Sequence, residues 1–205
     1  MNQEGVAPHE HRDDFAGKLG MWLFLLTEIL LFSGLFLCYS YLRAKYPAEF
    51  HHAGSDMNVV LGVANTLILL TSSLTLAVGI VAMQGRKRRL ALGCVLATIL
   101  LGAVFLVDKA VEWTAEIRRG FYPGSPHLAA QPPGEQVFFG LYYTMTGLHG
   151  LHVIAGISVL SVMAVWVARG TLDPERPLAL ENSGLYWHLV DVIWIFLLPL
   201  FYLAA

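Results

Sequence analysis

The segment TMTGLHGLHVIAG, residues 144–156, is apolar enough for a membrane, yet it carries two histidines, His149 and His152, three residues apart. Side chains at this spacing share one face of a helix, and Gly156, one turn further on, shares it too. The segment lies within an uncharged run of 33 residues, 136–168. A bilayer core about 30 Å thick needs roughly 20 helical residues. The run therefore predicts a tilted or protruding membrane helix with a polar face.

Four further apolar runs are long enough to cross a bilayer. Of the 205 residues, 56% are hydrophobic and 14% charged, whereas soluble domains carry about a quarter charged residues. The mean hydropathy of +0.59 agrees with a protein dissolved mostly in lipid. We predict an all-α membrane protein, a bundle of five transmembrane helices forming one domain over residues 18–205 after a polar tail over 1–17. The predicted spans cover about residues 19–42, 57–84, 89–117, 136–168 and 181–204.

The connecting segments predict the orientation, because basic loops stay in the cytoplasm. The side with the N-terminal tail collects eight basic residues, four of them in the turn QGRKRR at 84–89, and the other side collects four. The N-terminus is therefore predicted to be cytoplasmic and the C-terminus periplasmic. The connector at 119–135 holds four prolines, so we expect no helix there. Aromatic residues near the span ends, including Tyr39 and Tyr202, are predicted interface anchors.

Composition also argues against several classes of function. A net charge of −2 without a basic face does not indicate a nucleic-acid partner. Cys38 and Cys94 both lie in apolar runs without metal or redox spacing, so we expect buried free thiols. The sequence shows no internal repeat of the kind from which many transporters are built.

Two carboxylates inside the predicted spans are candidates for function, because ionisable groups there are costly. Glu28 lies about ten residues into the first span, roughly 15 Å deep and near the bilayer middle. It suits either a proton relay or a protonated carboxyl bonded to a neighbouring helix. Glu112 lies four residues from Asp108 and Glu116, and Lys109 is placed to neutralise it. A solvated helix end is the alternative there.

His188 and Asp191 repeat the three-residue spacing in the last span, where Asp191 is placed to orient or pair with the imidazole. By depth they fall in the inner half of the membrane, as His149 and His152 do. We predict a polar cluster of His149, His152, His188 and Asp191, with Glu28 as a further member. Its possible roles are structural hydrogen bonding, lipid headgroup contact and proton handling. Metal ligation is disfavoured, because helical pairs usually ligate at i, i+4.

The second predicted span carries amides and hydroxyls that are expected to hold helices together. These side chains are Asn65, Thr66, Thr71, Ser72, Ser73 and Thr75.

Together these segments resemble subunit III of the haem–copper oxidases, and most closely the cytochrome c oxidase form, over about residues 15–203. The stretch TGLHGLHVIAG resembles the family signature T-G-x-H-G-L-H-V-x-x-G, and YWHLVDVIWIFL resembles its terminal [YF]-W-H-F-V-D-V-V-W. Three further stretches resemble shared helices of the family: LGMWLFLLTEILLFSGLF at 19–36, ANTLILLTSSLT at 64–75 and DKAVEW at 108–113.

The resemblance implies a non-redox accessory subunit of a proton-pumping terminal oxidase that passes electrons from cytochrome c to oxygen. No cofactor is expected in this chain, because the family's haems and copper lie in subunits I and II. The chain is expected to pack on subunit I, to hold phospholipid and to support proton uptake, with Glu28 and Glu112 serving uptake or interhelical contact. Subunit II, a small subunit IV and a respiratory supercomplex are further expected partners. A multi-pass location in the bacterial cytoplasmic (inner) membrane follows.

Two alternatives stay open. Five-span relatives also occur in quinol oxidases and as accessory subunits of nitric oxide reductases, and the electron donor binds elsewhere. A different class is a free-standing membrane transporter or metalloenzyme that uses the polar cluster. This chain also departs from the family at Val60, where members often carry a carboxylate five residues before the Asn65–Thr66 pair. A role that depends on that carboxylate is therefore in question here.

Overall fold

The computed structural model describes residues 8–55, 57–172 and 177–203, and side chains from Ala16 onward. The first seven residues of the predicted polar tail lie outside this part, and so does Arg176, one of the eight basic residues counted for the orientation. Every regular element in the described residues is helical. In chain order these are α1 (Pro8–Lys45), α2 (Pro47–Ser55), α3 (Val59–Gln84), α4 (Arg88–Arg119), α5 (Pro126–Ala129), α6 (Pro133–Arg169), α7 (Leu178–Leu198) and the π-helix η1 (Pro199–Leu203).

Five of these helices are long and apolar enough to cross a membrane, which confirms the predicted number of spans. Their segments are Ala16–Lys45, Val59–Gln84, Arg88–Arg119, Pro133–Arg169 and Leu178–Leu203. The helices extend beyond the predicted boundaries at several ends. In particular, α1 begins at Pro8, within the segment predicted as a polar tail.

The proline-rich connector contains helix, so the prediction that it has none is wrong. The single turn α5 begins with Pro126, and the Ser125 Oγ caps it by accepting a hydrogen bond from the Leu128 N–H at 3.0 Å. Helix α6 likewise begins at Pro133. Proline is tolerated in a first turn, where its missing N–H would have no helical partner.

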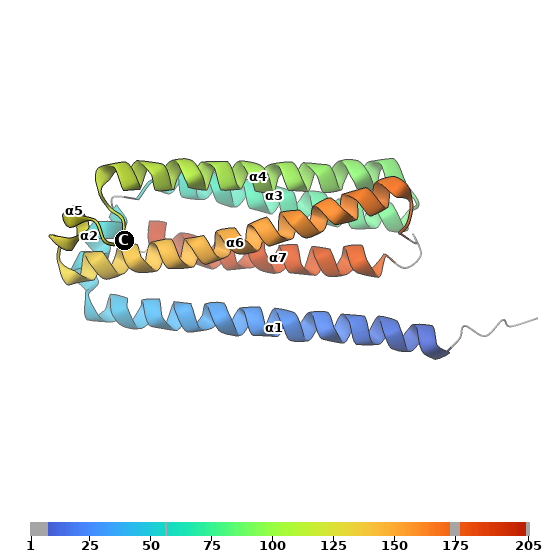
Figure 1. The fold of residues 1–205 in the computed structure, drawn as a ribbon, viewed down its shortest axis with the longest axis horizontal. Helices are drawn as coiled ribbons and strands as arrows, with labels where there is room; N and C mark the ends of the chain where they lie inside the picture. Colours follow the sequence, from blue (N-terminus) through green and yellow to red (C-terminus); the bar gives the residue numbers. More distant parts are fainter. Residues whose placement is uncertain (1–7, 56, 173–176, 204–205) are drawn as a thin grey trace, which may run out of the picture.

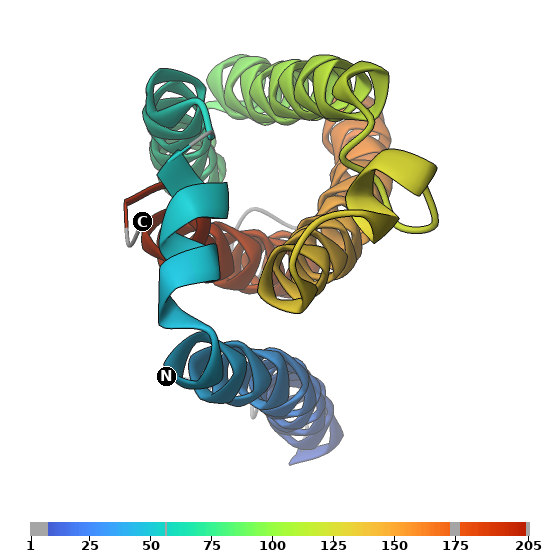
Figure 2. The ribbon, with the colours of Figure 1, turned by 90° about the vertical axis from the view of Figure 1, so that its left-hand side faces the viewer.

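Four of the spanning helices form a closed ring, and the fifth lies outside it. In the end view, α3, α4, α6 and α7 surround a common axis, with α3 against α4, α4 against α6, α6 against α7 and α7 against α3 (Figure 2). Helix α1 packs on the outside of this ring against α6 and α7 (Figure 1). Short α2 crosses one end of the bundle and links α1 to α3 (Figure 2).

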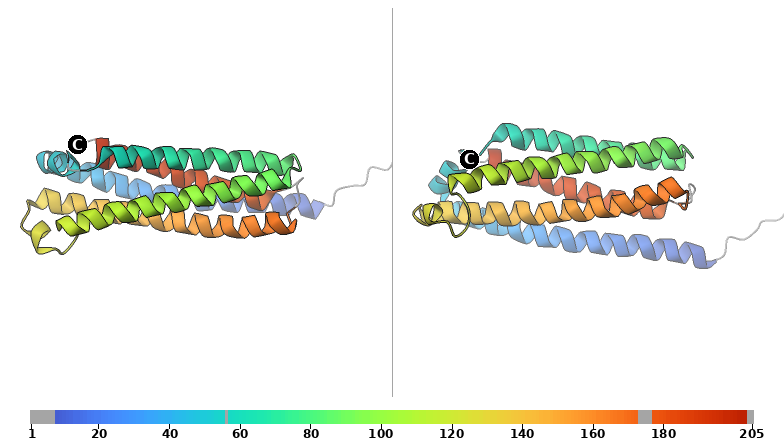
Figure 3. Two further views of the ribbon diagram at one scale, coloured as in Figure 1. Left: turned by 90° about the horizontal axis from the view of Figure 1, so that it is seen from above. Right: turned by 45° about the horizontal axis from the view of Figure 1, so that its top comes forward.

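The two ends of the bundle hold different connections. The α3–α4 turn lies at the same end as the start of α1, and α2, α5 and the end of η1 lie at the other (Figures 1 and 3). Helices α4 and α6 both end at left-handed glycines, Gly120 with φ 87° and Gly170 with φ 74°. Glycine adopts this conformation without strain, so both helices stop sharply. The arrangement agrees with connectors alternating between two sides of a membrane.

The centre of the ring is built around Trp187 of α7, whose side chain is fully buried. A Cβ on Gly102 of α4 would lie 2.6 Å from the Trp187 ring, and one on Gly156 of α6 would lie 2.8 Å from it. The indole therefore fills space that glycines leave open on two neighbouring helices, α4 and α6. Gly156 and His149 thus share a face of α6 that packs against tryptophans of α7.

Helix α1 is the least buried span. Only 11% of its most apolar window is buried, against 50% for the last span. Cys38 on this helix is exposed, so the prediction that it is buried is wrong. Val60 at the start of α3 is 78% exposed and also faces outward.

The interface-anchor prediction fails for Tyr39 and Tyr202, which are 3% and 2% exposed. The Tyr39 hydroxyl donates to the Leu200 carbonyl, tying α1 to η1. Both side chains are buried by contacts inside the chain, because α1, α2 and η1 cover this end of the ring.

Candidate functional site

Glu28 and His152 form a direct contact between α1 and the ring. The Glu28 Oε2 lies 2.7 Å from the His152 Nε2, and each side chain is 15% exposed. The other imidazole nitrogen, Nδ1, lies 2.7 Å from the Leu148 carbonyl oxygen. Phe32 packs its edge on the imidazole at 5.4 Å, and the Tyr186 hydroxyl donates to the His152 carbonyl at 3.2 Å. The imidazole is thus held on three sides.

These contacts restrict the protonation of the pair. A carbonyl oxygen only accepts, so the His152 Nδ1 carries a hydrogen. The Nε2–Glu28 contact then contains one shared proton. It is either a protonated carboxyl donating to a neutral imidazole or an imidazolium donating to a carboxylate. The pair is neutral overall in both forms, which suits a site of low dielectric within a membrane span.

His188 makes a separate contact, with α3. The Ser73 Oγ lies 2.5 Å from the His188 Nδ1. Asp191, on the same helix, is 3% exposed, and its oxygens have no hydrogen-bond partner by geometry among the described residues. Asp191 therefore does not orient His188 by a direct bond.

His149 lies in an aromatic environment at the centre of the ring. It is fully buried, with the Phe105 ring 5.5 Å away at 83° and the Trp194 ring 5.3 Å away. Neither ring nitrogen has a hydrogen-bond partner in the described part of the chain. The three histidines thus face different surroundings, and no hydrogen bond there joins them. The cluster predicted from depth is therefore not joined by hydrogen bonds among the described residues, because depth along a helix does not determine where each side chain points around the helix axis.

The hydroxyls of α3 join it to its neighbours, as predicted. The Trp187 Nε1 donates to the Ser72 Oγ at 2.9 Å, and the Trp194 Nε1 donates to the Thr66 Oγ1 at 3.0 Å. The Thr75 hydroxyl lies 2.9 Å from that of Thr98 on α4. Two members of the predicted set differ. Thr71 bonds within its own helix, and the buried Asn65 amide has no partner among the described residues.

A second polar cluster surrounds Glu112 near the other end of the bundle. The Lys109 Nζ lies 3.0 Å from the Glu112 Oε2, which confirms the predicted pairing. The Tyr142 and Tyr202 hydroxyls both contact the Glu112 Oε1, at 2.6 and 2.5 Å. The Lys109 ammonium also lies 5.0 Å from the Trp194 ring centroid. Lys109 and Glu112 are 8% and 5% exposed, so the solvated-end alternative is excluded for Glu112.

Sequence reasoning missed the partners of Glu112. Tyr142 and Tyr202 lie on α6 and η1, 30 and 90 residues away along the chain. Trp187 and Trp194 were also missed as core residues, although their seven-residue spacing places them on one face of α7. The seven-residue spacing is therefore the sequence feature that could have identified both tryptophans as core residues.

The described residues form a cavity beside α1 but no group of metal ligands. In the described residues, no three His, Cys, Asp or Glu side chains converge in a way that could hold a metal ion. A cavity of about 350 Å³ lies between α1, α6 and α7, lined by residues that include Met21, Phe24, Val159 and Tyr186. Its lining is mainly apolar, which suits a hydrocarbon chain.

These features define a class: a polytopic helical membrane protein in which several intramembrane polar side chains join its own helices. The sequence profile of the family described as Cytochrome c oxidase subunit III matches residues 4–205, and the chain belongs to this family. The family's members are subunits of haem–copper oxidases, which are oxidoreductase complexes.

Individual relatives agree with this assignment. The chain is 34% identical over 202 residues to "Cytochrome c oxidase subunit 3" of Thermostichus vulcanus, covering 96% of this chain and 90% of that protein. It is 31% identical over 188 residues to "Cytochrome bo(3) ubiquinol oxidase subunit 3" of Pseudomonas putida, covering 91% and 85%. It is 27% identical over 195 residues to "Heme-copper oxidase subunit I+III" of Aeropyrum pernix, covering 91% of this chain and 22% of that protein.

Proposed function

We propose that this chain is the non-redox subunit III of a proton-pumping cytochrome c oxidase in a bacterial inner membrane. In this role it stabilises the catalytic subunit I, holds phospholipid and supports proton uptake while oxygen is reduced to water. The observation that carries the proposal is that polar residues of the family-like segments bond helices of this chain to one another. Glu28, His152 and His188 all bond between helices of this chain, so they serve its architecture.

Haems and copper belong to the partner subunits in this proposal. Electron transfer then takes place entirely outside this chain, whose orientation is N-terminus cytoplasmic and C-terminus periplasmic. Subunit II, a small subunit IV and a respiratory supercomplex remain further proposed partners.

Contact with subunit I is supported by the exposed apolar surface of the spans and by the name of one relative. Trp22 and Leu37 on α1 are 61% and 72% exposed, and such side chains need lipid or protein around them. The relative from Aeropyrum pernix is named as a fusion of subunits I and III. A fused pair implies that the two parts function side by side in that protein.

Lipid holding is supported by the cavity between α1, α6 and α7. Its volume of about 350 Å³ and its position beside the loosely packed α1 suit part of an acyl chain. The Glu28–His152 pair lies next to the same groove, because Tyr186 both lines the cavity and bonds the His152 backbone. A lipid bound there would also cover the exposed part of the Glu28 and His152 side chains.

Support of proton uptake is assigned to Glu28, since its contact with His152 contains one shared proton. Glu112 is assigned an interhelical role instead. Its carboxylate is bonded by Lys109, Tyr142 and Tyr202 at once, and these bonds join α4 to α6 and η1.

A quinol oxidase is the second candidate, favoured by the relative from Pseudomonas putida, whose name specifies ubiquinol. A nitric oxide reductase accessory subunit is a variant of the same proposal. The rival of a different class is a free-standing transporter or metalloenzyme. Metal analysis of the isolated chain separates it, because a stoichiometric metal would favour the rival.

The test is oxygen consumption by the complex purified through a tagged chain, with reduced cytochrome c or quinol as the donor. Glu28→Gln keeps a hydrogen bond to His152 but has no ionisable proton, whereas Glu28→Leu loses both. We expect Glu28→Gln to preserve assembly and to lower turnover. Turnover of Glu28→Gln equal to that of the parent would rule out the proton role. Assembly that fails equally in both variants would contradict the structural account of the pair.

A further inference from the structure

Two polar side chains of the ring are completely buried and have no hydrogen-bond partner. Asn65 of α3 and His149 of α6 are each 0% exposed. Neither the amide oxygen and nitrogen of Asn65 nor the two ring nitrogens of His149 have a partner among the described residues. Buried polar groups in folded proteins are nearly always hydrogen-bonded, because losing water without a replacement is costly. The two side chains therefore indicate a further hydrogen-bonding molecule inside the ring.

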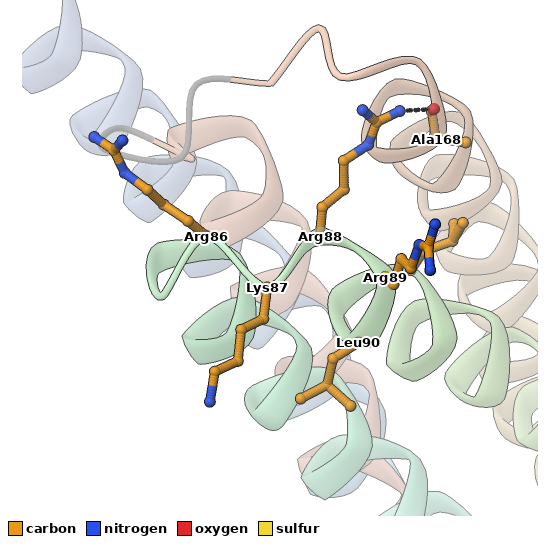
Figure 4. Close-up of a pocket in the computed structure, with 7 residues that line it drawn as sticks. Arg86, Lys87, Arg88, Arg89, Leu90 and Ala168 are labelled. Carbon is orange, nitrogen blue, oxygen red and sulfur yellow. Dashed lines mark hydrogen bonds between the residues drawn. The ribbon is translucent and has the colours of Figure 1, made fainter.

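Trp187 defines one layer of the ring. Its Nε1 donates to the Ser72 Oγ on α3, and its ring lies against Gly156 on α6. The Arg88 guanidinium, beside the α3–α4 turn, donates to the Ala168 carbonyl near the end of α6 (Figure 4). Helices α3 and α6 thus both end at the side where α7 begins (Figure 1). A step of about two turns, or seven residues, forward along α7 is matched by seven residues back along α3 and α6.

The next layer contains both unpartnered side chains. The step leads to Trp194 on α7, Asn65 on α3 and His149 on α6. The contacts of Trp194 agree with this alignment. Its Nε1 donates to the Oγ1 of Thr66, the residue after Asn65, at 3.0 Å, and its ring centroid lies 5.3 Å from that of His149. Asn65 and His149 therefore lie at one level of the bundle.

The two side chains enter this level from opposite sides. Helices α3 and α6 are diagonal in the ring, since each packs against α4 and α7 (Figure 2). Their buried sides face α4, α7 and the space that the four helices enclose. A molecule bound between Asn65 and His149 would therefore connect two helices that are not neighbours in the ring.

The neighbouring side chains do not satisfy these polar groups. Phe105 meets the His149 ring at 83°, with the centroids 5.5 Å apart, and offers no hydrogen-bonding atom. The Trp194 indole uses its only donor in the bond to α3. The Lys109 ammonium, 5.0 Å from the Trp194 ring centroid, already contacts three oxygens of the cluster around Glu112. The partner of both groups is therefore expected to come from outside the chain.

Water suits both groups best. The Asn65 amide can donate and accept, and a neutral imidazole has one donor and one acceptor nitrogen. Buried waters typically make about three hydrogen bonds to groups that otherwise have none. Because both side chains are completely buried, the ligand must also be small enough to be enclosed. A metal ion is a poorer fit, since no three His, Cys, Asp or Glu side chains converge in the part of the chain that the structure describes.

We propose that Asn65 and His149 share at least one buried water molecule, which joins α3 to α6 across the ring. In the layer of Trp187 an indole fills the interior and bonds Ser72 directly. In the layer of Trp194 polar side chains of two diagonal helices share the interior with water. The proposal rests on the four-helix ring alone, so its failure leaves the proposed function untouched.

The first test compares two buried tryptophans in the unmodified protein. The full chain, purified in mild detergent with its native partners, receives brief X-ray pulses that convert water into hydroxyl radicals, and oxidised residues are located by mass spectrometry. Trp194 lies in the proposed water layer, whereas Trp187, equally 0% exposed, is the internal control. Because the radicals form only where water is present, Trp194 is expected to be oxidised about tenfold faster than Trp187. Equal oxidation of the two side chains, fast or slow, would overturn the proposal.

The second test removes one side of the bridge. Asn65→Leu keeps a similar volume without a hydrogen-bonding group, and is expected to lower oxidation of Trp194 about tenfold, to the rate of Trp187. Thr71→Val is the matched control on α3, because Thr71 is exposed and bonds within its own helix, and it should leave oxidation of Trp194 unchanged. Unchanged oxidation of Trp194 in Asn65→Leu would refute the bridge. A direct hydrogen bond between Asn65 and His149 would instead give slow oxidation of Trp194 in the parent protein itself, which also refutes it.

Discussion

Replacing Glu28 by leucine is expected to loosen α1 from the four-helix ring. The substitution removes the 2.7 Å contact with the His152 Nε2 and leaves that nitrogen without its carboxyl partner. Hydrogen bonds between membrane helices contribute about 1–2 kcal/mol in model peptides and about 0.6 on average in a folded membrane protein. Because α1 is the least buried span, a loss of about 1 kcal/mol is expected to weaken its docking roughly fivefold.

The assay is a double-mutant cycle on the full chain in mild detergent. Unfolding is followed during titration with a denaturing detergent for the parent, Glu28→Leu, His152→Leu and the double variant. If the two side chains act as one contact, the double variant is destabilised about as much as either single variant. The coupling free energy is then expected to be about 1 kcal/mol. Glu28→Gln is the matched control, since its amide still donates to the imidazole.

Strictly additive effects of the two leucine substitutions would refute this reasoning. They would mean that Glu28 and His152 stabilise the chain through separate partners. Equal destabilisation by Glu28→Gln and Glu28→Leu would also contradict it, because only leucine removes the hydrogen bond.

Three further predictions concern the ring itself. Gly102→Ala and Gly156→Ala are expected to destabilise the chain by about 1–3 kcal/mol, because each Cβ would meet the Trp187 ring within 3 Å. Gly150→Ala, whose Cβ meets nothing within 4 Å, should be neutral or stabilising in the same detergent titration. Trp187→Ala is expected to cost about 3–5 kcal/mol and to lower the amount of chain in membrane fractions, whereas Trp187→Phe loses mainly the bond to Ser72. Lys109→Met is expected to cost about 3–5 kcal/mol by leaving Glu112 unpaired, and the double variant Lys109→Met/Glu112→Leu should be more stable than Lys109→Met.

The number of spans could be predicted from sequence because hydrophobic length is a local property. Each of the five runs exceeds what a bilayer requires, and the structure has a helix over each. The helix ends were less predictable. Pro126 and Pro133 favour a loop when the sequence is considered alone, yet both occupy first turns, where proline is compatible with a helix.

The pairing of polar residues was only partly predictable. Lys109 and Glu112 are neighbours on one helix, so their contact follows from spacing alone. The contact between Glu28 and His152 joins residues 124 positions apart and depends on where α1 docks. Depth along the helix placed His149 and His188 at similar levels but gave no rotation about the helix axis. Rotation decides that His149 meets aromatic rings while His188 meets Ser73.

The central claim is that this chain works as subunit III within a haem–copper oxidase. It is tested most directly by purifying a tagged chain from native membranes in mild detergent and recording a reduced-minus-oxidised optical spectrum. The account predicts haem bands and larger co-purifying subunits in fixed proportion to the chain. A colourless preparation of the chain alone, stable in the same detergent, would contradict it.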